Sequence, residues 1–284
     1  MAKFKIGVLI ESMGLPFWEG VAKAKELGVE GIQFFTVTGE MDPENLDAEK
    51  RQELKKRIAD HGLEIASTCG HIDMKGFITE EGNKWKVPKT KKILELATDL
   101  GTDIVTGHIG HLDPEADPAG WDAARKAMEE IGEHGKKVGA LFAEETGPEP
   151  PEVLREFIES CDTDGLKVNY DPANLVMVAG VDPVPGVKVL APYIVHTHAK
   201  DGLRRGTWGV GEFFEALEHV GDTPIAWGDY FAEVPLGQGN VGFPAWIAAL
   251  SEIGFNGYLT IEREVGEDPV SDIKGGIEFL RQFQ

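Results

Sequence analysis

The sequence predicts a protein of the α/β class with the architecture of a (β/α)8 TIM barrel, and two observations lead to this prediction. Apolar β-type runs alternate with helical stretches along the chain, and eight strands can be counted. Alternation of this kind produces a parallel sheet, and eight βα units close into a barrel. No GxGxxG motif follows the first strand, which disfavours the alternative of a doubly wound open sheet.

The expected elements follow one another in regular order. The strands are expected at residues 4–10, 31–35, 63–68, 103–107, 140–145, 166–171, 193–198 and 258–262. The helices are expected at residues 17–27, 45–61, 88–100, 118–137, 150–160, 182–190, 243–253 and 270–282. We expect one domain over residues 1–284, with a lid insertion at about 201–233 that includes a helix at 211–219, since long loops in compact domains often cover binding sites.

Glycine marks the end of several expected helices. The residues are Gly28, Gly62, Gly101, Gly135 and Gly254, and an apolar run begins shortly after each. Glycine adopts the left-handed conformation of a helix C-terminus without the strain that other residues incur. The first four glycines are separated by 34 to 39 residues, which is the length of one βα unit.

Charge and composition limit the possible partners. The chain has 28 Lys and Arg against 49 Asp and Glu, a formal net charge of −21, which opposes binding to nucleic acid or to an anionic membrane. The same charge does not oppose a small neutral sugar or a divalent cation. Cys69 and Cys161 are too few for a disulfide framework. Because no signal peptide or membrane-spanning stretch is evident, we expect a cytoplasmic protein, and association into a homo-oligomer is left open.

Polar groups end four consecutive expected strands. They are Glu144 and Glu145, then Asp171, then His196 and His198, then Glu262. The C-terminal ends of barrel strands form the active site of TIM-barrel enzymes. Three carboxylates and one imidazole are too costly to bury together without a positive charge between them. Oxygen-rich ligands with one nitrogen suit Mn²⁺, Mg²⁺, Co²⁺ or Zn²⁺.

Five segments in the chain carry a family resemblance. They are Glu145-Thr146-Gly147, Asp171-Pro172-Ala173-Asn174-Leu175, His196-Thr197-His198-Ala199-Lys200-Asp201, Val234-Pro235-Leu236-Gly237-Gln238-Gly239 and Ile261-Glu262-Arg263-Glu264. Together they resemble the xylose isomerase-like TIM-barrel superfamily, and more narrowly its sugar phosphate isomerase/epimerase members, which include ketose 3-epimerases. The resemblance covers nearly the whole chain and is strongest from 140 to 284.

The resemblance implies a set of functional residues. It assigns one divalent metal ion, with Mn²⁺ expected first, to Glu145, Asp171, His198 and Glu262, and it makes Glu145 and Glu262 the catalytic acid and base. A metal ion on the carbonyl and hydroxyl oxygens of a sugar stabilises the enediolate that forms when the neighbouring proton leaves. The chain departs from the epimerases at Asn174, where they carry His.

Six residues are expected to bind substrate. They are His71, His108, Asn174, His196, Lys200 and Arg204. Arg204 matches an arginine of the epimerases, whereas Pro151 stands where they place a second Glu. His71 and His108 have the alternative of capping loops, and Lys200 has the alternative of an ion pair with Asp201.

Four functions compete on this scaffold. The leading hypothesis is a metal-dependent sugar isomerase or epimerase. The second is a metal-dependent lyase or dehydratase of an inosose, a dehydroshikimate or a 3-oxo-sugar, which uses the same enolate chemistry but expels a hydroxyl group. A nuclease that resembles endonuclease IV is disfavoured because it needs a basic groove. A non-catalytic sugar-binding barrel is disfavoured because all four expected ligands are present.

Overall fold

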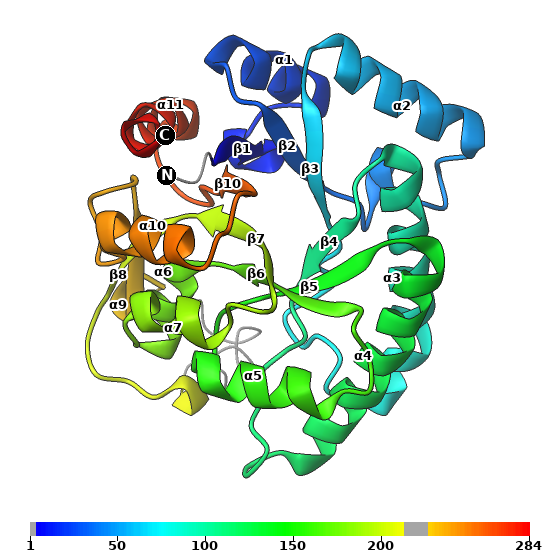
Figure 1. Ribbon diagram of the computed structural model, residues 1–284, viewed down its shortest axis with the longest axis vertical. Coiled ribbons are helices and arrows are strands. Elements are labelled where there is room, and N and C mark those ends of the chain that lie inside the picture. Colours follow the sequence, from blue (N-terminus) through cyan, green and yellow to red (C-terminus); the bar gives the residue numbers. More distant parts are fainter. Residues whose placement is uncertain (1–3, 213–226) are drawn as a thin grey trace.

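The expected barrel is confirmed by the computed structural model, which describes residues 4–212 and 227–284 (Figure 1). Its eight strands are all parallel and close in the order β1-β10-β7-β6-β5-β4-β3-β2. The strands are β1 (Lys5–Leu9), β2 (Gly31–Phe35), β3 (Glu64–Cys69), β4 (Ile104–Gly107), β5 (Leu141–Glu145), β6 (Leu166–Tyr170), β7 (Ile194–Ala199) and β10 (Tyr258–Ile261).

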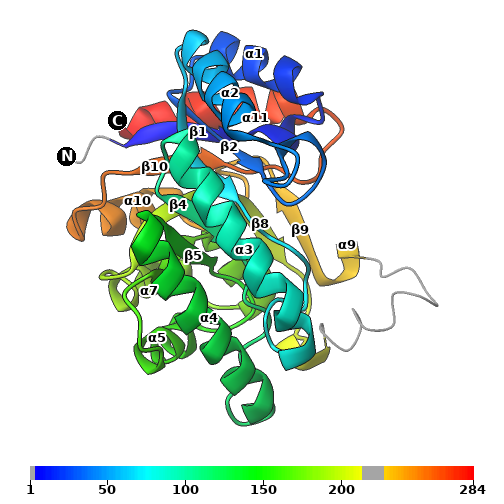
Figure 2. The same ribbon diagram turned by 90° about the vertical axis from the view of Figure 1, so that its right-hand side faces the viewer.

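Helices surround the barrel, as the turned view shows (Figure 2). The longer ones are α1 (Phe17–Leu27), α2 (Ala48–Asp60), α3 (Glu80–Leu100), α4 (Pro118–Val138), α5 (Pro151–Ser160), α7 (Pro183–Val189), α10 (Phe243–Glu252) and α11 (Pro269–Leu280). Shorter turns are α6 (Pro172–Asn174), α9 (Trp227–Tyr230), a π-helical turn (Leu175–Ala179) and three 3₁₀ turns (Ile10–Met13, Gly39–Met41 and Arg281–Phe283). The apolar faces of helices and strands form one continuous core.

The expectation for one helix C-terminus is wrong. Gly28, Gly62, Gly101 and Gly254 have the positive φ expected of helix ends. Gly135 instead lies inside α4, which ends at Val138 and is capped by Gly139 with φ of 83°. A Cβ atom at Gly135 would lie 2.5 Å from the carbonyl oxygen of Ala140, so this glycine allows the helix to approach the start of β5 closely.

The helix α3 begins earlier than expected. The expectation started it at Pro88, but Thr79 caps a helix that begins at Glu80, with its hydroxyl accepting from the Gly82 amide at 3.3 Å. Pro88 therefore lies in the third turn of the helix, a position that proline seldom occupies. The tertiary packing of α3 against its neighbours outweighs that local preference.

An antiparallel ribbon projects from the barrel after β7. It pairs β8 (Asp201–Arg204) with β9 (Phe231–Val234). The buried carboxylate of Asp201 accepts hydrogen bonds from the amides of Gly237, Gly239 and Val241 and so fixes the base of this ribbon. The expected helix at 211–219 lies largely outside the described residues, and the lid remains a prediction. None of the described helices is long and apolar enough to cross a membrane.

Candidate metal centre

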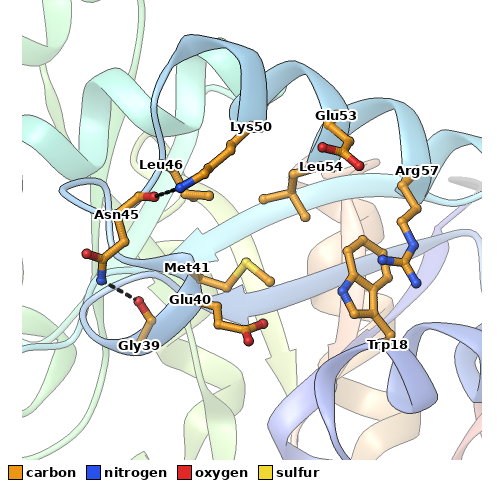
Figure 3. A pocket seen from close by; sticks show the side chains of 10 residues that line it. All are labelled: Trp18, Gly39, Glu40, Met41, Asn45, Leu46, Lys50, Glu53, Leu54 and Arg57. Carbon is orange, nitrogen blue, oxygen red and sulfur yellow. Dashed lines mark hydrogen bonds between the residues drawn. The ribbon is translucent and has the colours of Figure 1, made fainter.

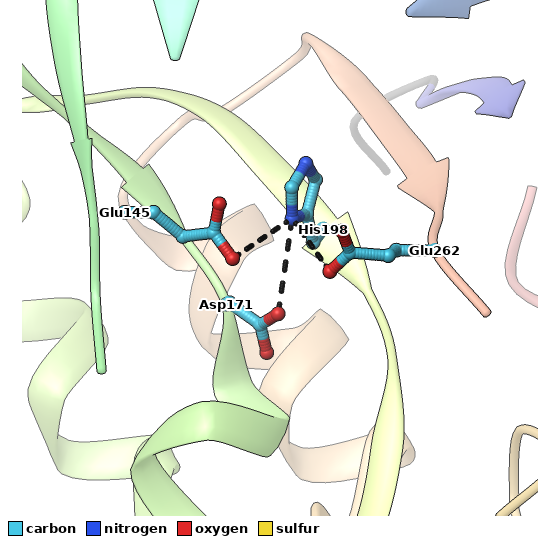
Figure 4. A group of neighbouring side chains, drawn as sticks. All are labelled: Glu145, Asp171, His198 and Glu262. Carbon is cyan, nitrogen blue, oxygen red and sulfur yellow. Dashed lines mark ion pairs between the residues drawn. The ribbon is translucent and has the colours of Figure 1, made fainter. Parts of the chain in front are cut away.

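The four expected ligands meet at the C-terminal mouth of the barrel (Figure 4). Glu145 ends β5, Asp171 follows β6, His198 lies on β7 and Glu262 follows β10. One ligand atom from each residue lies within 4.8 Å of the others, and all four side chains are buried. Residues far apart in sequence thus come together because parallel strands end at the same rim.

The ring of His198 is oriented by a residue that the sequence analysis missed. Its Nδ1 lies 3.3 Å from Oε1 of Glu145 and 3.2 Å from Oε2 of Glu262. Its Nε2 lies 2.8 Å from Oε1 of Gln33 in β2, and the Gln33 amide donates in turn to the hydroxyl of Thr106 at 2.8 Å. Since the Gln33 oxygen accepts a hydrogen bond from Nε2–H, Nδ1 is left to face the carboxylates. The sequence did offer one signal for Gln33, which is a polar residue within an otherwise apolar expected strand.

Electrostatics show how strongly this cluster attracts positive charge. Burial opposes a charge on His198, but Glu262 and Glu145 outweigh it and raise the pKa of the imidazole well above its usual value. Burial alone would raise the pKa of Glu145, but His198 and His108 outweigh this effect and lower that pKa to about 2. Despite its burial, Glu262 has a pKa held well below the usual value by Lys200 and His198, whereas burial raises the pKa of Asp171. Glu145 and Glu262 therefore stay ionised at neutral pH, and a positive charge is required beside them.

The chemistry of the donor set fits a divalent ion. One oxygen of Asp171 accepts from the amides of Ala173 and Asn174 at 2.7 and 3.0 Å, which fixes the carboxylate. Its other oxygen, Oδ2, is buried and has no hydrogen-bond partner among the described residues. It lies 3.8 Å from Nδ1 of His198. Three carboxylates and one imidazole form the donor set expected for Mn²⁺ or Mg²⁺.

Lys200 contacts the cluster rather than Asp201. Its buried Nζ donates to Oε2 of Glu262 at 3.0 Å and also contacts Glu264. The alternative of an ion pair with Asp201 is wrong, because that carboxylate binds backbone amides. Lys200 therefore places a fixed positive charge beside one of the two expected acid/base residues.

Three further expected residues lie near Glu145. The amide of Asn174 donates to Oε1 of Glu145 at 3.0 Å. Nε2 of His108 lies 3.8 Å from the same oxygen. The ring of His71 packs edge-on against that of His108, with centroids 5.0 Å apart. These side chains form one continuous polar wall beside the cluster.

His196 and Arg204 have contacts of another kind. His196 is buried, its Nε2 lies 3.2 Å from the Ser67 hydroxyl, and burial lowers its pKa to about 3, so the ring is neutral. Arg204 donates to the carbonyl oxygens of Met177 and Val178 at 3.0 and 2.6 Å. Roles for both in substrate binding remain predictions.

Glu144 points away from the cluster, as strand alternation requires. Its carboxylate is fully buried and has no hydrogen-bond partner among the described residues. Burial, together with the nearby Glu149, raises its pKa well above the usual value. Glu149 is equally buried, and its pKa is raised to about 8 by burial. The sequence analysis did not single out Glu149.

Comparison with known proteins places the chain in a family. A family model described as a xylose isomerase-like TIM barrel matches residues 21–283. The chain belongs to this family. No curated protein matches it.

Solved structures share the fold of this family member. A xylose isomerase domain protein from Planctomyces limnophilus is 24% identical, with a TM-score of 0.80 over 99% of this chain and 97% of that one. A D-tagatose 3-epimerase-like protein is 20% identical, with a TM-score of 0.74 over 99% and 97%. The probable 3-DHS dehydratase AsbF from Bacillus anthracis is 18% identical, with a TM-score of 0.74 over 98% and 99%. At these identities the likeness establishes the fold.

Proposed function

We propose that the protein is a divalent-metal-dependent sugar isomerase or epimerase. The observation that carries this proposal is the convergence of four buried ligand atoms within 4.8 Å at the barrel mouth. A xylose isomerase-like family and structural neighbours that include a 3-epimerase-like protein support the same class of reaction.

In this proposal the metal is held by Glu145, Asp171, His198 and Glu262. We expect Mn²⁺, with Mg²⁺, Co²⁺ and Zn²⁺ as alternatives. When bound, a divalent ion supplies Lewis-acid stabilisation of the negative charge that develops on the sugar oxygens. Gln33 keeps Nδ1 of His198 available as a ligand.

Proton transfer is assigned to Glu145 and Glu262. Both are held ionised, as a base requires, and Nδ1 of His198 lies between them at 3.3 and 3.2 Å. One carboxylate removes the proton next to the sugar carbonyl. Delivery of that proton by the same carboxylate to the neighbouring carbon gives isomerisation. Protonation of the original carbon on the opposite face, by the other carboxylate after it has taken up a proton from water, gives epimerisation.

The substrate contacts follow from the polar wall around the cluster. We assign hydroxyl recognition to His71, His108 and Asn174, which lie on the Glu145 side. Lys200 neutralises charge on the Glu262 side. His196 and Arg204 complete the proposed set.

The test is solvent deuterium exchange into ketoses in D₂O, followed by NMR with Mn²⁺-loaded protein. We expect deuterium at one sugar carbon, with a new isomer or epimer accumulating. A chelator should abolish exchange, and Mn²⁺ or Co²⁺ should restore it. Glu145→Gln and Glu262→Gln should each reduce turnover by about 10²–10⁴-fold with the fold retained by circular dichroism. Exposed Glu267→Gln is the matched control and should behave as wild type.

The dehydratase alternative gives a different product in the same assay. The structure of a probable dehydratase has the same fold. Loss of water from a hydroxy-carbonyl compound can also begin with removal of a proton next to the carbonyl. Release of water from an inosose or a dehydroshikimate, without any isomer or epimer from the ketoses, would replace our proposal with a lyase. Normal turnover by both glutamine variants would remove the assignment of Glu145 and Glu262.

A further inference from the structure

A second cavity opens at the same rim, on the side of β1, β2 and β3. Its volume is about 550 Å³, within the ~300–1,000 Å³ typical of small-molecule sites. Glu11 lines it after β1, Val37 and Glu40 after β2, and His71 and Ile72 after β3. In the closed barrel these strands lie away from β5, β6 and β7, which carry three of the four metal-binding residues.

This cavity adjoins the metal centre but is separate from it. None of the four candidate ligands is among the described residues that line it. His71 is a lining residue, and its ring packs against His108, which lies 3.8 Å from Oε1 of Glu145. His71 and His108 thus connect the wall of the cavity to Glu145 of the metal centre.

The walls of the cavity combine apolar surface with hydrogen-bond acceptors. Phe17, Phe35 and Val37 supply apolar surface, while Glu11 and Glu40 supply carboxylates. Oε1 of Glu11 accepts from the Phe35 amide at 3.1 Å, which fixes this side chain. Sugar rings have the matching character, since they present C–H faces and hydroxyl donors.

Two details of the wall define the ligand further. No lysine or arginine is found among the described residues that line the cavity, so the described lining offers no cation to a phosphate, and the exposed carboxylate of Glu40 repels one. Nδ1 of His71 is buried and has no hydrogen-bond partner among the described residues. That nitrogen is closed off from the cavity, so only the rest of the half-buried imidazole, a donor or an acceptor according to its tautomer, is offered to a bound hydroxyl group.

We propose that this cavity binds a second, neutral glycosyl unit, so that the substrate is a disaccharide or glycoside whose reacting unit lies at the metal centre. The proposal rests on the proposed function for its reaction, but the binding of the second unit can be measured without turnover. It assigns the substrate class as unphosphorylated and larger than one sugar ring.

A neighbouring cavity of about 570 Å³ supplies the control (Figure 3). The two cavities share Glu40 and Met41 as lining residues. The outer cavity continues between α1 and α2, where Cζ of Arg57 lies 3.6 Å from the centroid of the Trp18 ring. Exposed Glu53 lies on its far wall. A two-unit substrate does not need this outer cavity.

The experiment compares D-fructose with the glucosyl-fructose disaccharides maltulose and isomaltulose. Saturation-transfer NMR detects contact between the protein and the glucosyl ring, and deuterium exchange gives kcat/KM. We expect saturation of the glucosyl protons and a kcat/KM at least tenfold higher for a disaccharide than for D-fructose. Thr38 is an exposed residue that lines the cavity, and Thr38→Trp fills the cavity with a large side chain. This variant should abolish the saturation of the glucosyl protons. It should also lower the ratio of kcat/KM for the disaccharide to kcat/KM for D-fructose at least tenfold. Glu53→Gln should leave the ratio unchanged.

The outcomes separate the two proposals. If deuterium enters D-fructose but neither glucosyl ring is saturated, the second subsite is overturned and the proposed function stands. The same conclusion follows if Thr38→Trp leaves the ratio of kcat/KM for the disaccharide to kcat/KM for D-fructose unchanged. Saturation of the glucosyl ring that Thr38→Trp removes, without exchange into any ketose, upholds the subsite and overturns the isomerase or epimerase assignment.

Discussion

At the scale of single residues, the two histidines of β7 have different partners although they lie only two positions apart. Alternation alone does not separate His198 from His196, since both point to the same side of β7. The structure separates them by their partners, which are three carboxylates for His198 and the Ser67 hydroxyl for His196.

Gln33 provides the sharpest residue-scale prediction. Replacement by Leu removes the acceptor that fixes Nε2 of His198, and partners of this kind typically account for 10–100-fold in metal affinity. We expect Gln33→Leu to raise the Kd for Mn²⁺ by this factor in isothermal titration calorimetry. Exposed Gln52→Leu on α2 is the matched control. Equal affinities for wild type and Gln33→Leu, with both folded, would show that Gln33 does not orient the ligand.

At the scale of elements, the strands are the most predictable part of the chain. They are buried on both faces in a parallel barrel, so they stand out as apolar runs. Helix boundaries are less predictable because packing decides them. Gly135 and Pro88 are residue types that occur at helix ends, and each was expected to mark one. Gly135 instead lies inside α4 and allows that helix to approach β5 closely. Pro88 lies inside α3, which is longer than expected.

Gly135 allows this explanation to be tested. Glycine to alanine within a helix normally stabilises by up to ~1 kcal/mol. At Gly135 the added methyl group meets the Ala140 carbonyl oxygen at 2.5 Å, so we expect Gly135→Ala to lower the melting temperature. Gly275→Ala in α11, where a Cβ meets nothing within 4 Å, should raise it. A higher melting temperature for Gly135→Ala would contradict the close-approach explanation.

The segment between β5 and α5 carries a prediction on pH. Burial raises the pKa of Glu149 from 4.5 to about 8, so the folded state keeps a proton that the unfolded chain has lost. The free energy of unfolding should therefore fall as pH rises from about 4.5 to 8. Glu149→Gln carries no titrating proton, and its melting temperature relative to wild type should rise across this interval.

The control for this measurement lies on the next helix. Glu156 is exposed on α5, and Glu156→Gln should follow the pH dependence of wild type. Parallel curves for wild type and Glu149→Gln between pH 5 and 8.5 would mean that Glu149 does not retain its proton in the folded protein.

At the scale of the whole molecule, barrel closure turns separate strand ends into one site. The strand count predicts the fold, and closure alone then places four polar strand ends at one rim. The cavity on the side of β1, β2 and β3 was not predictable, because loops that follow different strands form it jointly. In the two proposals, the metal centre lies on the side of β5, β6, β7 and β10, and the neighbouring cavity on the side of β1, β2 and β3 selects the substrate.

The most direct test of this account is the metal content of the protein after equilibrium dialysis against Mn²⁺, measured by elemental analysis. The predicted result is one ion per chain in the wild type, with loss of that ion in Asp171→Asn and in His198→Ala. A folded wild-type protein that retains no ion, or variants that retain it as well as wild type, would contradict the central claim that these four side chains bind a divalent metal.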